Sequence, residues 1–124
     1  MKQTPADEQQ KGLDMIKAVY VDKEATVNGR TYTILTLQHH DRLKVFSYFT
    51  TVKDQMEQGN LGFMGTLEWL AIDKLISSKL SFNGDILSKI PGHFDGEAAE
   101  DYVTLMSTMM AVFSYPFLKG SLTS

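Results

Sequence analysis

The sequence contains no cysteine, which excludes disulfide bonds and thiolate chemistry. Histidine is also scarce: with only three in 124 residues and no thiol, a zinc site is not expected. His39 and His40 are adjacent, which would point them in different directions on a helix, and we expect both in solvent at a helix start. His93 follows a Pro-Gly pair and is expected to pack or cap locally. We therefore predict no metal and no cofactor.

Long apolar runs and a basic face are missing as well. The longest apolar stretches are too short for a membrane span, and no apolar segment follows the N-terminal lysine, so neither a membrane anchor nor a signal peptide is expected. The 12 basic and 15 acidic residues give a net charge of −3 without forming blocks, which argues against a nucleic-acid partner. With 43% hydrophobic and 22% charged residues, the chain is predicted to be one soluble, intracellular domain spanning 1–124.

Catalytic motifs are not found in the sequence. It has no phosphate-binding glycine loop, dinucleotide fingerprint or nucleophile elbow. The spacing of Asp14, Glu68, Asp73 and Glu100 singles out no pair of carboxylates for acid–base catalysis. We therefore predict that the protein is not an enzyme; a pocket with converging polar groups would favour the enzyme alternative.

Hydrophobic periodicity predicts a mostly α fold, a small helical domain with one β-hairpin in its N-terminal half. Helices are expected over residues 6–20, 40–57, 66–80 and 97–114. Asn28-Gly29, between two β-rich arms, predicts a hairpin at 24–35, because a type I′ turn needs positive φ at both positions. Residues 81–97 carry three turn signals and are assigned to a connection. Pro116 is expected to end the last helix, with a short flexible tail at 120–124.

Wide apolar faces stand out on the predicted helices. Leu67 and Leu70, with the other apolar residues of 66–80, predict burial on more than one side, and the last helix carries a methionine-rich stripe. Such a stripe is usually core, yet a short chain could leave part of it for self-association or for an apolar partner helix, and methionine adapts to varied partners. The predicted partner-binding residues are Phe46, Phe49, Met106, Met109, Met110 and Phe113.

The order of several short motifs resembles a known family. The hairpin "VNGRTYTILTL" is followed by "DRLKVFSYFTTV", then by "GTLEWLAIDKLISSKL", then by "HFDG", and the last helix ends in "SYPFLKG". In this order, over roughly residues 24–120, the chain resembles the tail assembly chaperones of long-tailed, lambda-like bacteriophages. The resemblance implies a protein of the host cytoplasm that coats the apolar, helical tape measure protein, keeps it soluble while the tail tube polymerises, and is absent from the mature virion. Self-association into that coat is part of the expectation.

Many members of this family are made in two forms. The longer form arises by a −1 ribosomal frameshift near the end of the short reading frame, and its extension is thought to recruit the tail tube protein. Phe117, Leu118 and Lys119 can be spelled UUU UUA AAG, which contains a slippery heptamer, so these three residues mark the predicted frameshift site. A frayed terminus of small residues is the simpler interpretation of the end of the chain.

Two other classes of function remain open on the sequence alone. One is a small connector or completion protein that stays in the virion, and the other is a helical adaptor or regulator directed at the host. A connector would be found in purified virions, whereas an adaptor would have a defined partner and no link to a tape measure gene.

Overall fold

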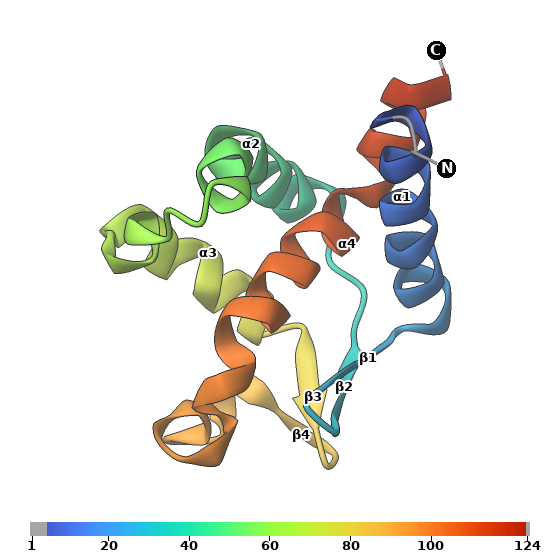
Figure 1. Ribbon diagram of the computed structural model, residues 1–124. Helices are drawn as coiled ribbons and strands as arrows, with labels where there is room; N and C mark the ends of the chain where they lie inside the picture. The colour runs from blue at the N-terminus through green and yellow to red at the C-terminus, as the bar shows by residue number, and fades with distance from the viewer. Residues whose placement is uncertain (1–4, 124) are drawn as a thin grey trace.

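The computed structural model describes residues 5–123, with side chains for 11–119, and contains four α-helices and four short strands in that range (Figure 1). In chain order these are α1 (Pro5–Asp22), β1 (Glu24–Val27), β2 (Arg30–Ile34), α2 (His39–Glu57), α3 (Leu67–Ser77), β3 (Leu80–Phe82), β4 (Asp85–Ile86) and α4 (Tyr102–Thr123). Short 3-10 segments occupy the connections, namely η1 (Gly62–Gly65), η2 (Leu87–Lys89), η3 (His93–Asp95) and η4 (Glu97–Asp101). The predicted mostly α fold with a hairpin in its N-terminal half is confirmed.

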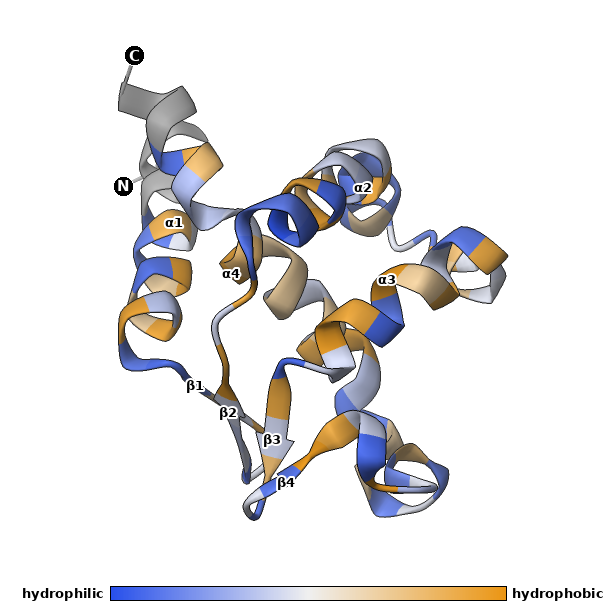
Figure 2. Ribbon diagram, turned by 180° about the vertical axis from the view of Figure 1, so that it is seen from behind, coloured by the Kyte–Doolittle hydropathy of each residue, from blue (hydrophilic) through white to orange (hydrophobic). Residues whose placement is uncertain are grey.

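Helix α4 lies at the centre of the molecule. It contacts α1, α2, α3 and β1, and Figures 1 and 2 both show α1 on one side of it and α3 on the other. A helix covered from several directions can bury apolar residues all around its circumference. The buried side chains of α4 are Leu105, Met106, Met109, Met110, Val112, Phe113, Ser114 and Tyr115.

The four strands form a single antiparallel sheet in chain order. The β1–β2 hairpin turns at Asn28 and Gly29, whose φ angles are 50° and 82°. These are the positive values that a type I′ turn requires, which explains why this dipeptide identified the hairpin in the sequence. The side chains of β1 and β2 alternate between exposed and buried, so one face of the hairpin lies against the core.

A second hairpin, β3–β4, was not predicted. It turns at Asn83 and Gly84, with φ angles of 53° and 88°, inside the segment 81–97 that the sequence assigned to a connection. Its strands have only three and two residues, too few to show an alternating pattern. The two hairpins are joined because Tyr32 of β2 pairs with Phe82 of β3.

Helix α4 differs from the predicted last helix at both ends. Glu97–Asp101 form η4, and the α-helix begins at Tyr102 rather than at residue 97. It then passes through Pro116 and continues to Thr123, so the predicted end at residue 114 is wrong. Residues 120–123 of the predicted tail continue the helix, while Ser124 lies outside the described residues.

Contacts on both sides of Pro116 account for its place inside a helix. Proline removes one backbone hydrogen bond and costs about 3 kcal/mol in a helix interior. The ring of Tyr115 lies 5.1 Å from that of Tyr20 on α1, and the ring of Phe117 lies 4.9 Å from that of Phe46 on α2. Tyr115 is buried, and burial of an aromatic side chain contributes about 1.5–3 kcal/mol, which offsets much of the cost of the proline; the half-buried Phe117 adds a smaller contribution.

Helix α3 buries one face only. Trp69, Ile72 and Ile76 are directed into the core. Leu67 and Leu70 lie on the opposite face and are 82% and 50% exposed. The prediction that α3 is buried on more than one side is therefore wrong for these two leucines.

Candidate functional site

Four of the six predicted partner-binding residues belong to the core. Met106, Met109 and Met110 have no exposed surface, and Phe113 is 3% exposed. The reason is the central position of α4, which α1, α2 and α3 cover from several directions. The prediction that these four side chains bind a partner is corrected: their surface is already used inside the domain.

The other two predicted residues, Phe46 and Phe49, are half-buried on α2. Phe49 packs against the core. Phe46 instead lies against Phe117 of α4, with ring centroids 4.9 Å apart, and His39 lies 6.0 Å from the same Phe117 ring. Leu43, which is 41% exposed, shares this face of α2, because positions 39, 43 and 46 are separated by four and three residues.

We refer to His39, Leu43, Phe46 and Phe117 as the aromatic patch. It joins the first half of α2 to the last part of α4 and contains no acidic side chain. One of the six predicted binding residues, Phe46, and one of the predicted frameshift residues, Phe117, belong to it. Leu118 is half-buried and Lys119 is exposed; the frameshift prediction itself concerns codons and stays a prediction.

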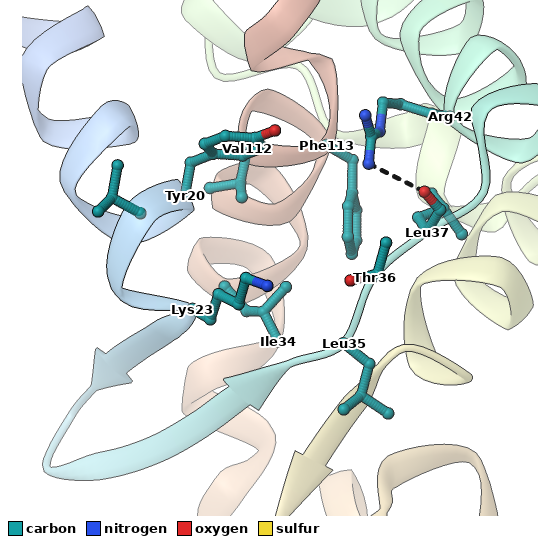
Figure 3. Close-up of a pocket in the computed structure, with 10 residues that line it drawn as sticks. Tyr20, Lys23, Ile34, Leu35, Thr36, Leu37, Arg42, Val112 and Phe113 are labelled. Carbon is teal, nitrogen blue, oxygen red and sulfur yellow. Dashed lines mark hydrogen bonds between the residues drawn. The ribbon is translucent and has the colours of Figure 1, made fainter.

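A second feature is an apolar pocket between α1, the connection from β2 to α2, and α4 (Figure 3). Its volume is about 300 Å³, at the lower end of the range for ligand pockets. The lining residues are Tyr20, Val21, Lys23, Ile34, Leu35, Thr36, Leu37, Arg42, Val112 and Phe113. Val21 is 62% exposed and Leu35 is 37% exposed, so apolar surface continues out of the pocket.

Two cations and no acid are found among the ten residues that line the apolar pocket. Arg42 donates from Nη2 to the carbonyl oxygen of Leu37 at 2.9 Å, and its Nε is buried without a hydrogen-bond partner. Lys23 has a left-handed backbone, with φ 58°. That backbone is held by two hydrogen bonds of 2.8 Å, from Lys23 N–H to the oxygen of Val19 and from Ile34 N–H to the oxygen of Lys23. The pocket therefore combines apolar walls with positive charge.

A buried polar cluster connects the first hairpin to the beginning of α4. Asp101 has no exposed surface, and its Oδ1 accepts hydrogen bonds from Asn28 Nδ2 at 2.9 Å and from Arg30 Nη1 at 3.1 Å. Its Oδ2 accepts one from the hydroxyl of Tyr32 at 2.7 Å. Arg30 also pairs with the exposed Glu100 at 3.1 Å. Figure 2 shows mainly hydrophilic residues at this end of the molecule, in the hairpin turns and the 3-10 segments.

The cluster shifts the protonation of its members. Burial alone would raise the pKa of Asp101, but the hydrogen bonds from Tyr32 and Asn28 and the charge of Arg30 outweigh burial and hold that pKa below its ordinary value. Burial, together with the hydrogen bond to Asp101, raises the pKa of Tyr32. Burial lowers the pKa of His93. These three pKa shifts favour the same charge states: an ionised Asp101 next to a neutral Tyr32, a neutral His93 and the cationic Arg30.

His93 packs against its neighbour Phe94, as the sequence predicts, but it also contacts Phe82 and the distant Tyr32. Its ring lies 4.8 Å from that of Phe82 and 4.7 Å from that of Phe94, and its Nε2 is 2.9 Å from the hydroxyl of Tyr32. Because the single hydroxyl proton of Tyr32 is donated to Asp101, Nε2 of His93 must be the donor in this contact. His39 and His40 are both exposed at the start of α2, as the sequence predicts.

Sequence reasoning missed the role of Asp101. Glu100 and Asp73 were considered as catalytic carboxylates, whereas the structure pairs Glu100 with Arg30 and places Asp73 among hydrogen bonds from Tyr102 and Ser77. The cluster joins residues of "NGRTY" to the segment after "HFDG", which the fold brings together. Nothing in their spacing indicated that they meet, because they lie about 70 residues apart.

Comparison of the chain with protein-family models, with curated protein sequences and with solved structures gave no match. Within residues 5–123, no helix has the length and apolar character required to cross a bilayer. The same part of the chain holds no group of three or more His, Cys, Asp or Glu side chains placed to bind a metal ion. The candidate site consists of the aromatic patch and the apolar pocket.

Proposed function

We propose that the protein is a tail assembly chaperone of a long-tailed, lambda-like bacteriophage. It would bind the apolar, helical tape measure protein in the host cytoplasm and keep it soluble until the tail tube has formed around it, without a catalytic step and without remaining in the virion. The order of motifs along residues 24–120, from "NGRTY" to "PFLKG", supports this proposal.

The observation that carries the proposal is the aromatic patch. Leu43 and Phe46 of α2 and Phe117 of α4 leave apolar surface uncovered where two helices meet. Apolar helices are commonly bound by such surfaces, which take up residues spaced three or four positions apart along the client. A contact through only four side chains is expected to be weak, which suits a client that must later be released.

Several copies along one client would turn weak contacts into stable coverage. Once one copy is bound, its neighbours are held at a high effective concentration, so the coat is stronger than any single contact. A longer form, extended by a frameshift at Phe117–Lys119, would bring tail tube subunits to this coat. Expression of the native gene with an N-terminal tag tests that part, because a minor longer product joined at these residues is expected.

The main test is co-expression with the tape measure protein encoded in the same genome. The wild-type chain should increase the soluble fraction of the client, and Leu43→Asp, in the aromatic patch, should abolish the increase. Thr51→Asp, an exposed change that adds the same charge about two turns further along α2, is the matched control and should behave like wild type. The proposal fails if Leu43→Asp still solubilises the client while remaining folded.

A virion-resident connector is the alternative from a different class. Mass spectrometry of purified virions separates the two, because a chaperone should be missing and a connector should be present in a fixed copy number. Detection of the protein in mature virions would favour the connector, and a stable complex with a host protein would favour the adaptor.

A further inference from the structure

The most exposed large apolar side chain among the described residues lies far from the apolar pocket. Leu67 is 82% exposed and Leu70, one helical turn later, is 50% exposed. Glu68 between them is also exposed. We call Leu67, Glu68 and Leu70 the α3 knob.

The knob is held rigidly by the rest of α3. Thr66 caps the helix by accepting a hydrogen bond from the backbone N–H of Trp69 at 3.2 Å. Trp69 is fully buried, and its Nε1 donates to the hydroxyl of Tyr102 at 2.8 Å. With this face of α3 fixed in the core, the opposite face presents Leu67 and Leu70 to the outside. A rigid, exposed pair of leucines loses little conformational entropy when it binds.

The chemistry of the apolar pocket complements that of the knob. The pocket offers apolar walls that continue onto exposed Val21 and Leu35, together with the cations Lys23 and Arg42 and no acid. The Nε of Arg42 is buried without a hydrogen-bond partner, an arrangement that costs free energy. Leu67 supplies an aliphatic side chain, and Glu68, about 100° further around α3, supplies a carboxylate at the edge of the same exposed surface.

The two surfaces lie on opposite sides of the molecule. Figures 1 and 2 show α3 and α1 separated by α4, and the pocket opens between α1 and α4 (Figure 3). A chain therefore cannot fill its own pocket with its own knob. We propose that the α3 knob of one copy binds in the apolar pocket of the next copy, so that copies associate head to tail. A head-to-tail contact that does not close on itself extends into a linear array.

The proposal supplies the contact between copies that a coat on a long client requires. Its purpose rests on the proposed function, but the contact itself needs no client, so each can fail without the other. Lys74 is exposed on the same face of α3 and lies about 10 Å along the axis from Leu67.

The first test is the average mass of the purified full chain by light scattering, without client, from about 10 μM to about 1 mM, a range that reveals association with Kd near 0.1 mM. The average molar mass of the wild-type chain should increase with protein concentration. Leu67→Asp in the knob and Val21→Asp at the pocket rim should each weaken association by about 30-fold or more, as for the loss of a central interface contact. Met15→Asp is the control: Met15 is 72% exposed on α1 but does not line the pocket, and its variant should behave like wild type.

Mixing the two defective variants distinguishes head-to-tail association from other arrangements. Leu67→Asp keeps a working pocket and Val21→Asp keeps a working knob, so the mixture should form heterodimers and nothing larger. The charge contact is tested by Lys23→Glu and Glu68→Lys, each of which should weaken association, whereas the double variant should recover it. Unfolding curves of every variant show that the exposed substitutions leave the fold intact.

Three outcomes would overturn the proposal. The first is a wild-type chain that stays monomeric at 1 mM. The second is a mixture of Leu67→Asp and Val21→Asp that stays monomeric or forms large species. The third is equal loss in Met15→Asp, which would indicate a general effect of added charge. If wild type is monomeric but a client peptide with a leucine beside a glutamate binds in a Val21-dependent way, the pocket is a client site and contact between copies is excluded.

Discussion

Tyr32 donates a 2.7 Å hydrogen bond to the buried carboxylate of Asp101, which lies 69 residues further along the chain. The bond connects strand β2 to the segment that leads into α4. Asn28 and Arg30, from the same hairpin, reach the other oxygen of this carboxylate. A single acidic side chain therefore fixes the position of the hairpin against the central helix, and the stability of the domain should depend on it.

Asp101→Asn should lower the free energy of unfolding by about 2–4 kcal/mol, because the half-buried Arg30, the buried Tyr32 hydroxyl and the exposed Asn28 amide lose their charged, buried acceptor. Urea unfolding followed by circular dichroism measures the change. Glu97→Gln is the matched control, since Glu97 also pairs with Arg30, at 3.7 Å, but its side chain is 97% exposed. The control should change stability by less than about 0.5 kcal/mol. An equal loss in both variants would show that the buried carboxylate has no special role.

The pH dependence of stability should follow from the same cluster. The pKa of Asp101 is held below its ordinary value of 3.8, so the unfolded chain binds more protons and stability present above that pH is lost as the pH falls. Burial lowers the pKa of His93 from 6.5, which gives a loss of the same sign that begins at mildly acidic pH. Unfolding free energies should therefore fall below about pH 6.5 and fall again below about pH 4. The second decrease should be smaller in Asp101→Asn; an unchanged acid profile would contradict the assignment.

The sequence predicted those elements whose signal is local. Asn28-Gly29 identified the first hairpin because the turn itself demands these residues, and long periodic segments identified the helices. The same dipeptide at Asn83-Gly84 was not enough, because the two strands it joins are too short to show alternation. Pro116 was a misleading local signal, since tertiary contacts of the rings on both sides of it keep α4 helical.

The surfaces could not be predicted to the same extent. A stripe of methionines has the same pattern whether it is covered or exposed, and only the central position of α4 decides that Met106 and Met109 are buried. Leu67 and Leu70 follow the same helical spacing and are exposed. Asp101 carried no signal at all, because its partners come from a distant hairpin. Burial depends on which elements pack together, and local periodicity does not contain that information.

Lys23→Gly should separate folding from self-association. Lys23 has φ 58°, a conformation that glycine adopts without the steric cost paid by other residues, so the substitution should raise the unfolding free energy by about 1 kcal/mol. It also removes a cation from the apolar pocket and should weaken association between copies. Lys17→Gly, in the body of α1, should instead lower stability by about 1 kcal/mol. A Lys23→Gly variant that is less stable than wild type would contradict the strain argument.

Met109→Ala should lower the free energy of unfolding by about 2–5 kcal/mol, because it leaves a cavity in the centre of a well-packed core. Leu70→Ala, on the exposed face of α3, should change it by no more than about 0.5 kcal/mol. The light-scattering measurement should give the opposite order of effects. Leu70→Ala should weaken association between copies. Met109→Ala, measured at a temperature where the variant is folded, should not. This crossing of effects separates core from surface more directly than either variant alone. Loss of association in a folded Met109→Ala chain would indicate that the methionines of α4 contribute to the contact between copies.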